Sequence, residues 1–274
     1  DFLSEILFLA LTRRSPLDPF GGRAKRRYEY LHLIGSVVSD SHIRIALEHA
    51  KETREPWIAF WGCGKRDETP LDPELRARCV FHGARGPLTR DALGLPADTP
   101  LGDPALLLPA IYTPRRRAEL ADKTICAPHL LDRKSDAELL ESTGADVILR
   151  PGIAAEVEAA YAFIDQLVSA RFALCGALHA AIVRCAYGLP FAYFDSGYVD
   201  VPFKWRDFAA SVGVETRFAA TLAEGERVYA ETLAGRIALP PLEPIGRCAP
   251  FTLPRGLARR LARRETLDRP AILS

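Results

Sequence analysis

Residues 172–182 read Phe-Ala-Leu-Cys-Gly-Ala-Leu-His-Ala-Ala-Ile, and this stretch decides the expected fold. The apolar run Phe172 to Cys175 predicts a buried strand, and the small residues after it predict a turn into a helix whose first turn contains His179. An apolar strand followed by such a turn and a helix is typical of a parallel sheet with helices on both faces. Backbone N–H groups at a helix start attract anions, and a histidine there can exchange protons near neutral pH.

The same pattern recurs along the chain and predicts two sets of parallel strands. The first set is expected at residues 30–34, 57–61 and 80–82, with helices at 43–50 and 87–93. The second set is expected at residues 123–127, 146–149, 172–175 and 191–194. Prolines and three consecutive arginines between residues 109 and 122 indicate a connection between the two sets.

We therefore expect an α/β protein with two Rossmann-like domains whose parallel sheets face a cleft. The expected boundaries are residues 1–115 for the acceptor-side domain, 116–250 for the donor-side domain and 251–274 for a C-terminal helix that returns to the first domain. Open parallel sheets bind ligands at the carboxyl ends of their strands, so the site is expected in the cleft.

Composition indicates a globular protein without a strong overall charge. The 274 residues are 48% hydrophobic and 26% charged, which is ordinary for a folded domain. The formal net charge of +1 gives no general attraction for nucleic acid, so any preference for anions must be local. No apolar run reaches the ~20 residues that a membrane span needs, and the sequence shows no signal peptide.

The cysteines are scattered along the chain. They lack the close spacing of a zinc site and the density of a disulfide scaffold, so no metal site is expected. We expect reduced, mostly buried thiols and a cytoplasmic protein. The six residues are Cys63, Cys79, Cys126, Cys175, Cys185 and Cys248.

Short segments spread over the chain carry a resemblance to a known family. They are Arg85-Gly86-Pro87-Leu88-Thr89, Gly102-Asp103-Pro104-Ala105-Leu106, Ala127-Pro128-His129, Leu178-His179-Ala180-Ala181-Ile182 and Lys204-Trp205-Arg206-Asp207. In this order they resemble the polysaccharide pyruvyl transferase family, particularly the bacterial exopolysaccharide ketal-pyruvate transferases. The first residues, Asp1-Phe2-Leu3-Ser4, resemble the end of that family's Asn-x-Gly-Asp-x-Leu-Ser opening. Because the chain also contains no methionine, we expect the first strand of the fold to be missing from it.

The resemblance implies a glycosyltransferase B-like arrangement and a specific reaction. A pyruvyl group would pass from phosphoenolpyruvate, the donor substrate, to a sugar of an exopolysaccharide or cell-surface glycan precursor, forming a ketal and releasing phosphate without a cofactor. The acceptor would be a saccharide or a lipid-linked oligosaccharide. Two alternatives remain open: a nucleotide-sugar-dependent glycosyltransferase of the same fold, and an inactive relative with a binding role.

This reaction needs cations for a carboxylate and a phosphate, and a group that moves protons. We expect His179 to be the acid or base and Arg85 to grip the donor with two parallel hydrogen bonds. Lys204 is expected to neutralise the leaving phosphate. Further substrate-binding residues are expected at Gly35, Ser36, Gly62, Gly64, Lys65, His129 and Arg206. Each also has a structural interpretation, such as a helix-capping histidine or a surface cation.

Two further features bear on the site and on partners. Many relatives place an arginine two residues before the histidine, where this chain has Ala177, so the anion contact is expected from Lys204 or Arg206. Near the C-terminus, leucines recur every four residues among arginines over residues 253–264. This helix would either pack its leucines on the first domain or attract anionic lipid at the inner face of the cytoplasmic membrane.

Overall fold

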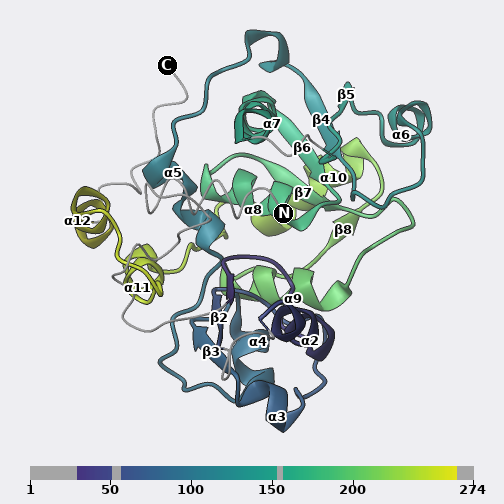
Figure 1. Ribbon diagram of the computed structural model, residues 1–274. Coiled ribbons are helices and arrows are strands. Elements are labelled where there is room, and N and C mark those ends of the chain that lie inside the picture. Colours follow the sequence, from purple (N-terminus) through teal and green to yellow (C-terminus); the bar gives the residue numbers. More distant parts are fainter. Residues whose placement is uncertain (1–29, 51–56, 153–156, 264–274) are drawn as a thin grey trace.

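The computed structural model describes residues 30–50, 57–152 and 157–263 and contains two parallel sheets (Figure 1). The three-stranded sheet has the order β1-β2-β3, formed by β1 (Tyr30–His32), β2 (Ile58–Trp61) and β3 (Cys79–His82). The five-stranded sheet has the order β5-β4-β6-β7-β8, formed by β4 (Thr124–Ala127), β5 (Val147–Ile148), β6 (Phe172–Cys175), β7 (Phe191–Phe194) and β8 (Phe218–Ala219). Every strand pairing in both sheets is parallel, which confirms the predicted α/β class.

Helices cover both faces of the larger sheet. Alternate residues of β6 point to opposite sides: Ala173 and Cys175 belong to the core beneath α7 (Val157–Ser169) and α8 (Leu178–Ala186). Phe172 and Leu174 instead pack with side chains from α6 (Asp136–Thr143) and α10 (Leu222–Val228). All four residues are buried, which explains why this strand is apolar throughout.

The smaller sheet has its own core and its own short helices. Side chains from α2 (Asp40–His49) and α3 (Pro73–Arg76) pack with β2 residues such as Ile58 and Phe60. α4 (Pro87–Ala92) follows β3. β1 ends at His32, two residues earlier than expected, because the chain bends before Gly35, which has a φ of +102°.

The two sheets share a continuous packed region. α9 (Pro202–Ser211) follows β7 of the larger sheet but packs on α4 beside the smaller one (Figure 1). Trp61 of β2 belongs to the main core and donates a hydrogen bond from Nε1 to the carbonyl oxygen of Ile245 at 2.9 Å. Ile245 lies in α11 (Leu242–Arg247).

Short helices lie between the two sheets. The predicted connection, residues 109–122, overlaps α5 (Leu108–Ile111) and contains η2 (Ala118–Leu120), and η1 (Pro104–Leu107) precedes it. The C-terminal helix, α12 (Arg255–Arg263), packs on α11 and α5, and its Leu257 and Leu261 are buried. This helix lies within the expected residues 251–274, and the residues after 263 lie outside the described part. The expectation of a missing first strand concerns residues that the structure does not describe.

The thiols and the helices bear on two other expectations. All six cysteines are free, and four of them are buried. Burial raises the pKa of the Cys175 and Cys185 thiols to about 12, so both are protonated and inert near neutral pH. Within the described ranges, every helix is too short or too polar to cross a membrane.

Candidate functional site

A cavity of about 660 Å³ lies between the two parallel sheets, where loops follow the carboxyl ends of their strands. The smaller sheet and α2 contribute the polar wall, with His32, Gly35, Ser36, His42 and Arg66. The larger sheet contributes His129, His179 and Lys204, together with an apolar wall from α7 and α8 that includes Ala160, Phe163, Ile164, Leu178 and Val183. Four of the six histidines in the chain therefore line this cavity.

His179 lies where the sequence predicts it, in the first turn of α8. The N-cap residue of this helix is Ala177, whose side chain cannot accept a hydrogen bond, and residues 177–180 line the cavity. The imidazole Nε2 lies 3.4 Å from Oδ2 of Asp103, a carboxylate with no exposed surface. A carboxylate in this position can orient the imidazole.

Asp103 also makes a contact at the start of η1. Its Oδ1 accepts a hydrogen bond from the backbone N–H of Ala105 at 2.9 Å and caps η1. The same side chain therefore connects the start of η1 to the histidine of α8.

Two histidines on the polar wall are held as neutral bases. His42 of α2 forms a 2.7 Å hydrogen bond between Nδ1 and Oγ of Ser39. Burial and the nearby charge of Arg66 lower the pKa of His42, and burial together with His42 lowers the pKa of His32 to about 4. Both start from a usual value of 6.5, so both are mostly uncharged at pH 7, and the pKa of about 4 makes His32 a weak base.

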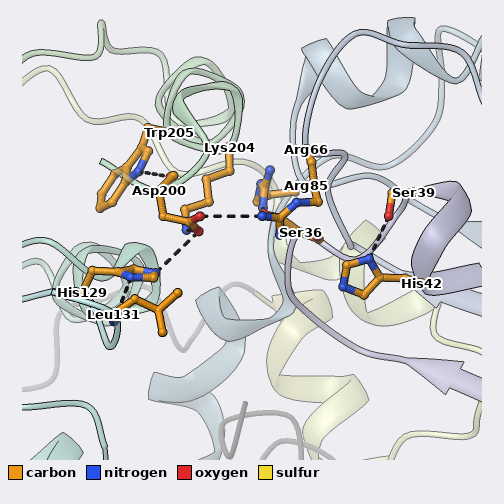
Figure 2. A network of polar contacts seen from close by, with 10 residues as sticks. All are labelled: Ser36, Ser39, His42, Arg66, Arg85, His129, Leu131, Asp200, Lys204 and Trp205. Carbon is orange, nitrogen blue, oxygen red and sulfur yellow. Dashed lines mark hydrogen bonds and ion pairs between the residues drawn. The ribbon is translucent and has the colours of Figure 1, made fainter. Parts of the chain in front are cut away.

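A network of charged side chains centres on Asp200, as Figure 2 shows. Oδ2 of Asp200 lies 2.5 Å from Nζ of Lys204 and 3.5 Å from Nε2 of His129. Oδ1 lies 3.6 Å from Nη2 of Arg66. Trp205 donates from Nε1 to the backbone oxygen of Asp200 at 3.1 Å, which fixes the end of the loop.

The hydrogen bonds define the protonation of this network. Nδ1 of His129 accepts the backbone N–H of Leu131 at 3.2 Å, so the neutral ring carries its proton on Nε2, facing Asp200. Burial alone would raise the pKa of Asp200, but its hydrogen bond to Lys204 and the charges of Lys204, His129 and Arg66 outweigh burial and lower it. Burial and the charge of Lys204 lower the pKa of His129 despite the opposing effect of Asp200. At neutral pH the carboxylate is therefore ionised.

The expected role of Arg85 as a donor ligand is not compatible with its position. Its side chain has no exposed surface and lies beneath the cavity wall. Nε forms an ion pair with Asp207 at 3.2 Å, and one terminal nitrogen donates to Oγ of Ser36 at 2.7 Å. Asp207 also accepts from the backbone N–H and the hydroxyl of Thr89 at 2.9 and 2.7 Å. The guanidinium therefore makes its contacts with other protein groups rather than with a ligand. Arg85 is a structural residue that supports the loop containing Ser36, which follows β1.

Four other expected ligands also lie away from the cavity. Lys65 is buried and donates from Nζ to the carbonyl oxygen of Thr69 at 2.6 Å. The small size of Gly64 serves packing, because a Cβ there would collide with the guanidinium of Arg85, and one at Gly62 would collide with Pro104. Arg206 is exposed on α9 and pairs with Glu68 at 3.4 Å.

Half of the residues expected from the sequence therefore line the cavity. Among the described residues, Gly35, Ser36, His129, His179 and Lys204 line the cavity. Nothing in the sequence indicated His32, His42 or Asp200. In the segment Gly62 to Arg66 the sequence offered two cations, and of these Arg66, not the selected Lys65, lines the cavity. Comparison of the chain with protein-family models, with curated proteins and with solved structures found no match.

Proposed function

We propose that this protein transfers a pyruvyl group from phosphoenolpyruvate to two hydroxyls of a saccharide, a precursor of an exopolysaccharide or another cell-surface glycan. The observation that supports this best is the composition of one cavity. It combines two cations, Arg66 and Lys204, with several imidazoles at the carboxyl ends of two parallel sheets. Its volume of about 660 Å³ leaves room for a sugar beside a donor as small as phosphoenolpyruvate.

The reaction requires two additions to C2 of the donor. A proton is added to the methylene carbon C3, and the oxygen of one hydroxyl bonds to C2 as that hydroxyl loses its proton. The C2–O bond to phosphate then breaks, and the oxygen of a second hydroxyl bonds to C2 and loses its proton. One hydroxyl proton balances the proton added to C3, and the other leaves with the phosphate.

The side chains divide these tasks between the two walls. His179 supplies the proton to C3, and Asp103 beside it holds the ring in place. His42 on the opposite wall is neutral and can take a hydroxyl proton. Arg66 and Lys204 stabilise the anionic donor, which supplies the contact that Ala177 cannot make.

The same proposal includes a glycosyltransferase B-like arrangement, in which two parallel sheets face one site. This arrangement is shared with enzymes that use nucleotide sugars, and fold alone does not fix the chemistry. Among the residues that the structure describes, the cavity lining contains no aspartate or glutamate that could bind a ribose.

Phosphate release tests the proposal directly. Incubation with phosphoenolpyruvate and methyl glycosides of galactose, glucose and mannose is expected to release phosphate only when an accepted sugar is present. UDP- and GDP-sugars serve as parallel substrates. Turnover of a nucleotide sugar without consumption of phosphoenolpyruvate would assign the glycosyltransferase alternative. If neither activity is found and calorimetry shows no binding of phosphoenolpyruvate, the result favours the third alternative, an inactive relative with a binding role.

Membrane attraction, which would place the enzyme at the inner face of the cytoplasmic membrane, has a separate test. Leu257 and Leu261 are already buried against the protein, so among the described side chains of α12 the exposed Arg259 and Arg260 remain for contact with lipid. Each could add about 1 kcal/mol near an anionic surface. Co-sedimentation with phosphatidylserine vesicles is therefore expected at low salt, and it should fall with added salt and in the R259Q/R260Q variant. Equal sedimentation with phosphatidylcholine vesicles would leave α12 only its packing role.

A further inference from the structure

We propose that Arg66, His129 and Lys204 form the phosphate subsite of the cavity and that Asp200 is an internal competitor for it. The carboxylate of Asp200 occupies the position that a phosphate group of the substrate would take, and the substrate must displace it. Identification of the anion as the phosphate of phosphoenolpyruvate rests on the proposed function. The competition itself applies to any phosphate.

Three side chains from separate segments converge on this one carboxylate (Figure 2). Arg66 follows β2, His129 follows β4 and Lys204 lies in the first turn of α9, so both sheets contribute. The two oxygens are used separately: Oδ1 faces Arg66 at 3.6 Å, and Oδ2 faces Lys204 at 2.5 Å and His129 at 3.5 Å. Phosphate oxygens would make the same kinds of contact, because ammonium, guanidinium and imidazole N–H groups all bind phosphate.

Asp200 can leave this position. Its side chain is 20% exposed, whereas those of Arg66, His129 and Lys204 are 38%, 15% and 9% exposed. Solvent therefore reaches the carboxylate from the side of Arg66, and two of the three groups that hold it are more deeply buried than it is. Movement of the loop 195–200 would expose the three donors without unfolding a helix or strand.

The backbone next to Asp200 is strained. Val201 has a φ of +50°, the left-handed region, and it is the only residue other than glycine with a positive φ in the described ranges. This conformation is rare for a β-branched residue, and the following Pro202 restricts Val201 further. The ion pairs of Asp200 hold this strain, so their exchange for a phosphate would allow Val201 to relax.

The charges determine the direction of the expected effect. Arg66 and Lys204 carry two positive charges near the carboxylate, which cancels one of them. An anion that enters while Asp200 remains would meet a like charge at close range, which is strongly unfavourable. If Asp200 instead served to orient Lys204 for the substrate, removal of its charge would weaken anion binding. The two roles predict opposite signs.

Calorimetric titration with inorganic phosphate at low salt separates the two roles. Asp200→Asn keeps an oxygen for Lys204 but removes the charge, and it is expected to bind phosphate roughly tenfold more tightly than the unmodified protein. Asp200→Ser provides a second variant and is expected to change affinity in the same direction. The matched control is Glu68→Gln, which neutralises an exposed carboxylate paired with Arg206, and its affinity is expected to be unchanged.

Unchanged or weaker phosphate binding by both Asp200 variants, with their melting temperatures retained, would overturn the inference. Lys204→Met is expected to abolish the gain when combined with Asp200→Asn, and a gain that persists would place the subsite elsewhere. Titration with phosphoenolpyruvate separates this result from the proposed function. If the Asp200 variants bind phosphate more tightly but the protein neither binds nor consumes phosphoenolpyruvate, the competitor role of Asp200 is supported and phosphoenolpyruvate is not the donor. If the protein consumes phosphoenolpyruvate but the Asp200 variants do not bind phosphate more tightly, pyruvyl transfer is supported and the competitor role is contradicted.

Discussion

Replacement of His179 by glutamine is expected to lower the turnover number for pyruvyl transfer by about 10²–10⁴-fold, the usual contribution of one positioned acid or base. Glutamine keeps hydrogen-bonding capacity near Asp103 but cannot donate a proton to carbon at neutral pH. The residue lies at the cavity wall with a side chain 19% exposed, so a loss of stability is not expected to dominate. The measurement is initial-rate phosphate release at saturating phosphoenolpyruvate.

A matched control is available on α2. His49 is exposed, interacts with the backbone oxygen of Ile45 at 2.8 Å and lies outside the cavity lining. His49→Gln is expected to leave turnover unchanged. If His179→Gln retains near-normal turnover, or loses no more than His49→Gln, then His179 does not transfer the proton. Calorimetry with phosphoenolpyruvate should show similar affinity for both variants, which separates chemistry from binding.

The strands and the start of α8 could be predicted because their signal is local. The run Phe172 to Cys175 is buried on both faces of a sheet, and this requires four consecutive apolar residues. The small residues that follow let the turn pack closely on the loop after β4. A Cβ at Gly176 would lie only 3.0 Å from the backbone nitrogen of His129. The end of β1 was less predictable because Leu33 and Ile34 are apolar and buried without belonging to the strand.

The site was less predictable because the partners of its charged groups are distant in sequence. Arg85 looks like a ligand at a glycine turn, but its partner Asp207 lies 122 residues later and removes it from solvent. Asp200 gives no local signal, since only the fold brings Arg66 and His129 to it. Sequence position identified the loops that form the cavity, and burial decided which of their side chains face it.

Replacement of Asp207 by alanine is expected to lower the free energy of unfolding by about 3–5 kcal/mol, the cost of removing one partner of a buried ion pair. Arg85 would keep its charge with no exposed surface, and Thr89 would lose the acceptor for both its backbone N–H and its hydroxyl. The interaction joins α9 to the turn before α4, so the loss should separate the two sheets before either unfolds. Urea unfolding followed by tryptophan fluorescence and circular dichroism measures this loss.

Two further variants test whether the ion pair between Arg85 and Asp207 stabilises the contact between the two sheets. Arg206→Ala removes the neighbouring exposed pair with Glu68 and is expected to cost less than about 1 kcal/mol, as surface pairs do. Replacement of both partners, Arg85→Met with Asp207→Leu, is expected to be less destabilising than Asp207→Ala alone, because no buried charge remains unpaired. If Asp207→Ala instead costs no more than Arg206→Ala, the network contributes little to the junction. The Ser36 loop, which Arg85 contacts at 2.7 Å, would then be held in the cavity by the packing of the shared core.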